Sequence, residues 1–120
     1  MNYELTYDEE RDLIVGYIHG DFDSSVVKKM ATDLANMVRK HGCSRGLDDL
    51  RGAQITPSVL DIYSMPKFVN QAGIPIICKR ALVVRELSED YHFLETVSAN
   101  VGQQVRIFTD PDAAIEWLLG

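Results

Sequence analysis

The sequence has few of the features that anchor, export or cross-link small proteins. It contains only two cysteines, Cys43 and Cys78, and they do not form a CxxC pair. No apolar run approaches the roughly 20 residues that a membrane-spanning helix requires. The opening residues, MNYELTYDEERD, lack the basic segment and apolar run of a secretory signal. We therefore expect a cytoplasmic protein with reduced thiols and no transmembrane segment.

Basic residues are also in short supply. Twelve lysines and arginines face 18 acidic residues, which gives a net charge of −6. This balance disfavours nucleic acid as a partner, because its phosphates require a basic surface. One local basic cluster, Lys79, Arg80 and Arg85, is interpreted as the solvated end of a strand.

Motifs of the common catalytic and cofactor sites are missing. The sequence has no GxSxG, GxGxxG or P-loop. His19, His41 and His92 are scattered, and no histidine and cysteine occur together at a metal-binding spacing. We predict no metal and no cofactor, and Cys43 and Cys78 are interpreted as small buried apolar residues. The chain is not expected to be an enzyme.

What the sequence does contain is a regular alternation of strand and helix patterns. Its 120 residues, 46% hydrophobic and 25% charged, are typical of one globular domain, here residues 1–120. The predicted strands cover residues 2–7, 13–19, 46–50, 80–85 and 105–107. The predicted helices begin at Asp23, Thr56, Ser88 and Asp110, which suit N-cap positions.

The order ββαβαβαβα predicts an α/β fold with a mixed five-stranded sheet. Right-handed crossovers make most strands parallel, and a hairpin over residues 8–12 makes the first strand antiparallel. Leu13–His19 and Ala81–Val84 are apolar on both alternating faces, which predicts central strands covered on both sides. Pro66 is expected to kink the second helix or to split it into two.

Three stretches of the chain resemble a known family. They are Gly20–Asp23, Leu47–Arg51, and Val105–Asp110 followed by Ala113–Leu118. With the element order, they resemble the STAS domains of anti-sigma-factor antagonists and their SEC14-like relatives. The resemblance implies a β-α superhelical layer with the helices mainly on one face. It also implies binding to a partner kinase, a phosphorylation switch at the start of the second helix, or, in SEC14-like relatives, a bound lipid.

Thr56 and Ser58 lie at that predicted helix start. A helix N-terminus offers free N–H groups that hold a phosphate or carboxylate, so these residues are a candidate phosphorylation or anion site. The alternative is simple capping by Thr56. The family's Asp-Ser pair is replaced here by Thr56-Pro57-Ser58.

Asp48, Asp49 and Arg51 form a second candidate, a partner-binding or loop site. An acidic pair at a strand end could hold Mg²⁺, but a β-pleat sends adjacent side chains to opposite faces. The structural interpretation is that one aspartate pairs with Arg51 while the other is solvated.

A third candidate is an apolar surface for a ligand or a dimer. Its residues are Tyr63, Met65, Phe68, Val69 and Ile76. If every helix lies on one face of the sheet, the other face must be covered by a second subunit, by this region or by an apolar ligand. We rank a homodimer first.

These observations lead to one hypothesis with two alternatives. The chain is interpreted as a non-catalytic binding or regulatory module that acts through protein–protein association, with itself or another protein. The first alternative is a small carrier for a lipid or other apolar molecule, and the second is an unrecognised enzyme.

Overall fold

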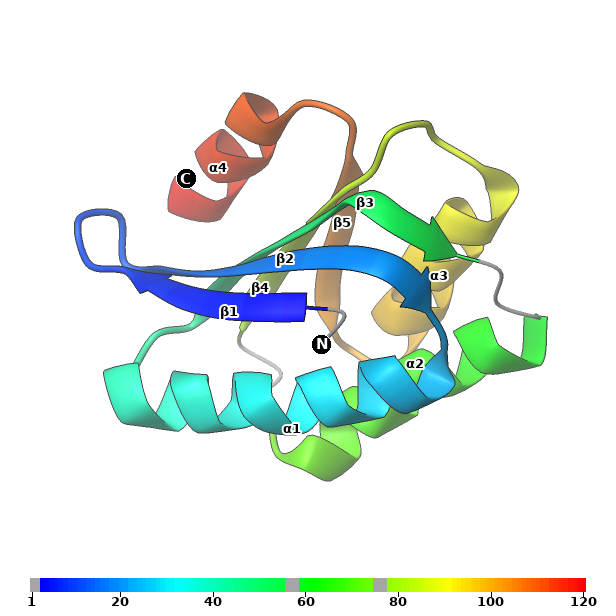
Figure 1. The fold of residues 1–120 in the computed structure, drawn as a ribbon, viewed down its shortest axis with the longest axis horizontal. Coiled ribbons are helices and arrows are strands. Elements are labelled where there is room, and N and C mark those ends of the chain that lie inside the picture. Colours follow the sequence, from blue (N-terminus) through cyan, green and yellow to red (C-terminus); the bar gives the residue numbers. More distant parts are fainter. Residues whose placement is uncertain (1–2, 56–58, 75–77) are drawn as a thin grey trace.

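The predicted element order is confirmed. In this computed structural model, residues 3–55, 59–74 and 78–120 are described, with only the backbone of residues 55 and 59–64. The elements are β1 (Tyr3–Asp8), β2 (Leu13–Phe22), α1 (Ser24–His41), β3 (Arg45–Ile55), α2 (Val59–Ala72), β4 (Lys79–Val83), α3 (Glu89–Asn100), β5 (Gln104–Phe108) and α4 (Pro111–Leu119). They build one α/β domain with a mixed five-stranded sheet (Figure 1).

The strands lie in the sheet in the same order as in the sequence. β1 pairs with β2 antiparallel through the predicted hairpin, and β2, β3, β4 and β5 pair in parallel. Each parallel neighbour is reached through one helix, which is the local β-α-β connection that the sequence pattern predicts. β2 and β4 are therefore interior strands, as expected.

Polar side chains fix where the helices begin. The carboxylate of Asp23 accepts a hydrogen bond from Val26 N at 3.1 Å, and Ser88 accepts one from Tyr91 N. Asp110 caps α4, with Pro111 at the first position. These three predicted N-caps are confirmed. Gly42 ends α1 with φ of 61°, a left-handed conformation that glycine adopts without strain. The fourth predicted cap, at Thr56, lies outside the described residues.

Helices cover both faces of the sheet. α1 and α2 lie on one side and α4 lies on the other (Figure 1). Leu94 of α3 joins the core that α1 and α2 build over β2 and β4. On the opposite face, Ala114 and Leu118 of α4 pack against Leu13, Leu47, Ala81 and Val83. We call these the lower face and the upper face of the sheet.

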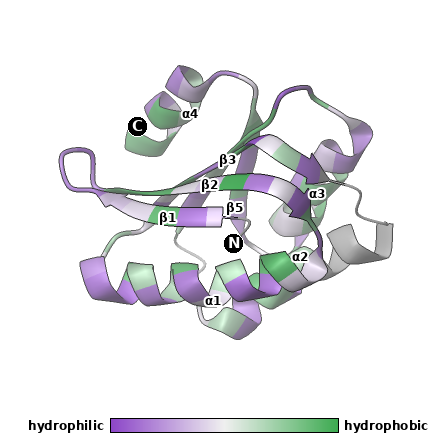
Figure 2. Cartoon of the chain, in the orientation of Figure 1, coloured by the Kyte–Doolittle hydropathy of each residue, from purple (hydrophilic) through white to green (hydrophobic). Residues whose placement is uncertain are grey.

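This arrangement corrects the argument that one face needs an external cover. The helices do gather mainly on the lower face, but α4 closes part of the upper one. A second subunit or ligand is therefore not required to bury the apolar upper-face positions of β2 and β4. Hydrophilic residues cover the β1–β2 hairpin, and apolar and polar bands alternate along α1 (Figure 2).

Three further expectations are corrected. β3 runs from Arg45 to Ile55, so the predicted loop over residues 51–55 continues the strand, paired with the end of β2. α2 is one helix with Pro66 inside it, so the predicted alternative of two short helices is wrong. Pro66 removes only one N–H from the helix, and the burial of Met65 and Val69 holds the surrounding turns. β2 is covered on both sides only in its first half, because Tyr17 is 45% exposed.

Among the described residues, no helix is long and apolar enough to cross a membrane.

Candidate functional site

A cavity of about 100 Å³ lies between the lower face of the sheet and the helices. Its walls are mostly apolar, and the described residues that form them include Val27, Met30, Leu34, Leu50, Met65, Val69, Leu82, Leu94 and Val105. Ser88 and Asp90 at the start of α3 line it and are exposed. The cavity therefore reaches the surface beside this helix start.

An ion pair stands in the wall of this cavity. Asp48 of β3 and Arg80 of β4 both line it, and Arg80 Nη2 lies 3.4 Å from Asp48 Oδ2. The Asp48 residue is only 3% exposed. Burial raises the pKa of the Asp48 carboxyl, and the attraction of Arg80 offsets this only in part. The distance between Arg80 Nη2 and Asp48 Oδ2 exceeds the roughly 2.7–2.9 Å of a strong charge-assisted hydrogen bond. This longer contact is consistent with an attraction that only partly offsets the effect of burial on the pKa of Asp48.

Gln103 contributes a third buried polar group. Its Nε2 donates to Pro66 O at 2.8 Å and to Asn70 Oδ1 at 3.0 Å, which ties the loop just before β5 to α2. The Pro66 carbonyl can only accept, so this contact identifies Nε2 as the amide nitrogen and leaves Oε1 as the acceptor.

Two polar atoms of this cluster lack partners among the described residues. They are Arg80 Nε, a donor, and Gln103 Oε1, an acceptor, and both are buried. Buried polar atoms are nearly always hydrogen-bonded in folded proteins. Each of these two atoms exposes less than 1 Å² of surface, so the cavity itself offers mainly apolar contacts.

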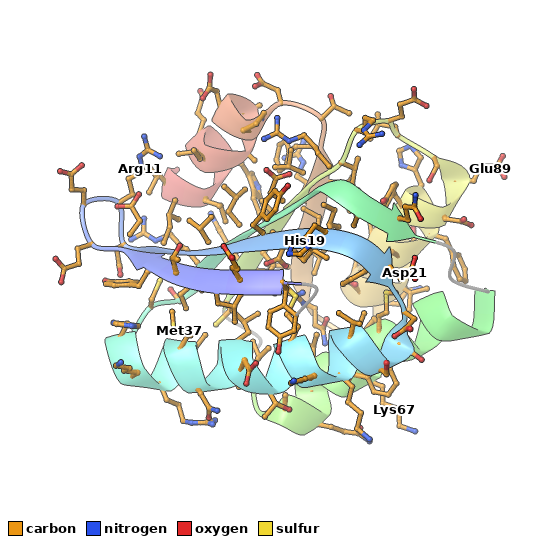
Figure 3. The ribbon with its side chains drawn as sticks, viewed as in Figure 1. Arg11, His19, Asp21, Met37, Lys67 and Glu89 are labelled. Atoms are coloured by element: carbon orange, nitrogen blue, oxygen red, sulfur yellow. The ribbon has the colours of Figure 1, made fainter. Side chains whose placement is uncertain are left out.

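A different group of side chains lies on the upper face, where α4 does not reach. Arg51 pairs with Asp49 through two hydrogen bonds, of 3.0 Å from Nε and 2.8 Å from Nη2. Arg85 Nη2 donates to the Arg51 carbonyl at 2.5 Å. The Tyr17 and His19 rings lie 5.7 Å apart, and Figure 3 marks His19 on β2. We call Tyr17, His19, Asp49, Arg51 and Arg85 the upper patch.

Gly52 makes room for the aromatic part of the upper patch. A Cβ atom at this position would lie 2.9 Å from Tyr17 Oη. The Tyr17 side chain thus extends across β3 instead of standing free in solvent. The Asp49 carboxylate, hydrogen-bonded to Arg51, has its pKa lowered, so it is ionised at neutral pH.

The structure separates the predicted Asp48, Asp49 and Arg51 group. Asp49 and Arg51 are paired on the upper face, while Asp48 faces the cavity below. The interpretation of the second aspartate as solvated is wrong, because Asp48 is buried with Arg80. Asp48 therefore lies on the opposite face of the sheet from Asp49, Arg51 and His19, and the four side chains do not form one site. Among the described residues, no group of three His, Cys, Asp or Glu side chains is placed to hold a metal ion.

The basic cluster and the apolar surface are also redistributed. Of Lys79, Arg80 and Arg85, only Arg85 is exposed, and the interpretation of Arg80 as solvated is wrong because its side chain is 17% exposed. Met65 and Val69 are buried and line the cavity, and Phe68 is half-buried, so these three do not form an exposed surface. The side chain of Tyr63, and Thr56, Ser58 and Ile76, lie outside the described residues.

The three histidines lie on β2, α1 and α3, whereas Cys43 and Cys78 belong to one buried cluster. His41 stacks on Tyr7 with ring centroids 4.0 Å apart. Cys43 and Cys78 are buried, and burial raises the pKa of both thiols. Raised pKa values make these thiols poor nucleophiles at neutral pH.

Sequence reasoning missed Arg80 and Gln103 as site residues. Strand alternation contained the signal for Arg80, because residues 80, 82 and 84 share a face and Leu82 and Val84 are apolar. The same alternation places Asp48 with Leu50. Nothing local marks Gln103, whose partners lie on α2, 33 and 37 residues earlier in the chain.

Comparison with known proteins identifies the fold. No protein-family model matches the sequence, and no curated protein matches it. Among solved structures, an uncharacterised DUF3478-family protein with a SpoIIAA-like fold from Shewanella loihica aligns with a TM-score of 0.63 and 15% identity, over 98% of this chain and 94% of that one.

Two anti-sigma factor antagonists also align along nearly their whole length. The one from Mycobacterium paratuberculosis gives a TM-score of 0.60 and 12% identity over 98% of this chain and 95% of that one. The unphosphorylated form of SpoIIAA gives 0.58 and 10% over 98% of each chain. The fold is therefore the SpoIIAA-like STAS fold, as the sequence resemblance implied.

Proposed function

We propose that this chain is a non-catalytic regulatory module that acts in the cytoplasm by binding a protein partner. The observation that carries the proposal is the alignment of the complete described fold with two anti-sigma factor antagonists. The fold alone does not specify function, so the surface must supply the rest of the argument.

The upper patch is the surface that suits this role. Tyrosine and arginine are enriched among the residues that dominate the energy of protein interfaces. Here the exposed Tyr17 and Arg51 lie on neighbouring strands, with the exposed Arg85 beside them in the loop after β4, and strands hold side chains more firmly than loops do. Contacts with Gly52 and Asp49 order Tyr17 and Arg51 before binding, which lowers the entropy lost on association.

The test compares capture of partners by the wild type and by two charge variants. Arg51→Glu reverses a charge within the upper patch, whereas Lys28→Glu makes the same reversal at an exposed position of α1. A protein captured by the wild type is purified and its Kd measured by calorimetry. We expect Arg51→Glu to weaken binding at least about tenfold, with Lys28→Glu within about twofold. Equal effects of the two variants, or self-association as the only binding that depends on Arg51, would contradict the proposal.

Thr56 and Ser58 remain the proposed point of regulation. Phosphorylation of either residue adds about −1.5 to −2 charges. Intact-mass analysis of protein isolated from its native cells, compared with the Thr56→Ala/Ser58→Ala double variant, tests this. A phosphate that maps elsewhere in the chain would contradict it.

The lipid-carrier alternative receives no support from the cavity volume. Pockets that enclose drug-sized ligands measure about 300–1,000 Å³. The cavity here, at about 100 Å³, does not enclose a long acyl chain.

A further inference from the structure

We propose that the cavity on the lower face of the sheet binds a neutral, apolar molecule about the size of one benzene ring. This site goes beyond the proposed protein-binding function and lies on the other face of the sheet from the upper patch. The proposal rests on the volume of the cavity, on the side chains that form its walls and on the charges beside them.

Apolar side chains from the helices and the sheet form most of the wall. Buried residues of α1, β3, β4 and α3 line the cavity, namely Val27, Leu34, Leu50, Leu82 and Leu94. Arg80 Nε and Gln103 Oε1 each expose less than 1 Å², so neither atom is available to a ligand. A molecule that enters the cavity is therefore held mainly by apolar contacts, and its transfer out of water supplies the binding free energy.

The cavity volume sets the size of the ligand. An engineered apolar cavity of about 150 Å³ binds benzene, whereas a single water molecule needs only about 10–15 Å³ of such space. The cavity here measures about 100 Å³, so it suits one small ring and not the long acyl chain of a lipid. The ring enters beside Ser88 and Asp90, where the cavity reaches the surface.

Two methionines allow the wall to adapt to such a ring. Met30 of α1 and Met65 of α2 line the cavity and are buried. A Cβ atom at Gly16 of β2 would lie 3.5 Å from Met30 Cε, so the Met30 side chain crosses from α1 to the sheet. Methionine is unbranched and polarisable, fills irregular spaces and makes favourable contacts with aromatic rings. An aromatic ring therefore suits this wall.

The charged residues of the site exclude an ionic ligand. Asp48 and Arg80 carry opposite charges in one wall and already pair with each other. A carboxylate in the cavity would approach Asp48 and Asp90, and a cation would approach Arg80. Either ion would also lose its hydration, which is unfavourable in so small an apolar space. A neutral ligand avoids both penalties.

Benzene and benzoate provide probes with the same ring and different charge. Each is titrated in sealed samples into the isotope-labelled full chain, and NMR follows the amide and methyl chemical shifts. We expect benzene to shift signals around the cavity in a saturable manner, and benzoate to bind at least about tenfold more weakly. Benzene at about ten times its Kd should also raise the Tm by about 5 °C, because it binds the folded state and not the unfolded chain.

Two alanine variants show whether benzene occupies the cavity. Ala31 lines it on α1, whereas Ala99 is exposed on α3. Ala31→Leu fills the space and should weaken benzene binding at least about tenfold, and Ala99→Leu should leave it unchanged. If Ala31→Leu does not fold, nuclear Overhauser effects in the wild type between benzene and the methyl groups of Leu50 and Leu82 provide the same test.

Several results would overturn the proposal. They are the absence of saturable shifts with benzene, equal benzene affinity in Ala31→Leu and the wild type, Overhauser effects only to side chains outside the cavity, and benzoate that binds as tightly as benzene. No protein partner is present in this experiment, so its failure would leave the proposed function standing.

Discussion

Replacement of Arg80 by methionine isolates the energetic role of the buried ion pair. Methionine keeps most of the length of the side chain but leaves the Asp48 carboxylate without its cation. Removing one partner of a buried pair costs about 3–5 kcal/mol, because the remaining charge is uncompensated. The total stability of a domain is typically about 5–15 kcal/mol, so we expect a large loss that still leaves a folded protein.

The contact distance places the loss within this range. Two unit charges 3.4 Å apart attract each other by about 5 kcal/mol at an effective dielectric constant of about 20. Part of this energy is recovered when the carboxyl of Asp48 takes up a proton. We therefore expect the variant to lose about 3 kcal/mol at pH 7.5, near the lower end of the range.

The direction of the pH dependence follows from the raised pKa of Asp48. In the folded state this carboxyl holds its proton more readily than in the unfolded chain, where its pKa is 3.8. The stability that it contributes is therefore complete below pH 3.8 and is lost as the pH rises through the native pKa. Without Arg80 the native pKa rises further, so the difference between wild type and variant is small near pH 4 and grows toward neutral pH.

Urea unfolding followed by circular dichroism at pH 4.5, 6.0 and 7.5 measures this difference. The double variant Asp48→Asn/Arg80→Met removes both charges, and we expect it to recover at least about 2 kcal/mol of the loss. Arg11→Met is the control, since Arg11 forms an exposed 4.0 Å pair with Asp8 and should cost less than about 1 kcal/mol. A loss in Arg80→Met that is the same at every pH, and additive with Asp48→Asn, would refute the reasoning.

Other predictions concern packing, alkaline stability and thiol reactivity. Gly16→Ala places a Cβ 2.9 Å from Asp48 Oδ1, so we expect it to lower the free energy of unfolding, measured in urea, by about 1–3 kcal/mol. Gly46→Ala is the control, because its nearest contact would lie at 3.9 Å and it should lower this free energy by less than about 1 kcal/mol. Similar losses in the two variants would contradict the prediction. Burial and a hydrogen bond to Asp33 raise the pKa of Tyr3 to about 12, so the free energy of unfolding should fall as the pH rises from 10 to 12. Tyr3→Phe should make this fall smaller. If urea unfolding at pH 9 and 11 shows the same fall in Tyr3→Phe as in the wild type, the prediction is wrong. Cys43 and Cys78 should react with a thiol reagent only after addition of urea, and rapid labelling of the native protein would contradict their burial.

The sequence was sufficient for those features that depend on neighbouring residues. The caps at Asp23, Ser88 and Asp110 act within one helical turn, and the hairpin over residues 8–12 joins adjacent strands. Hydrophobic periodicity likewise identified the strands and helices. The order of the parallel strands followed because each crossover links neighbours in the chain.

Features that depend on contacts between residues far apart in the chain could not be predicted from the sequence. The extension of β3 to Ile55 depends on pairing with the end of β2. Strand alternation places Arg80 with Leu82 and Asp48 with Leu50 on the buried face, but only the register of β3 and β4 pairs the two charged side chains in the wall of the cavity. α2 continues through Pro66 because contacts with the core outweigh local helix propensity.

The position of α4 has a consequence for how the chain is made. This helix is the last of the described elements to leave the ribosome, yet it covers Leu13, Leu47, Ala81 and Val83, which are synthesised long before it. Until α4 emerges, a nascent chain that has already paired its strands exposes these hydrophobic side chains to solvent. A chaperone that holds the growing polypeptide would meet its most persistent target at this site.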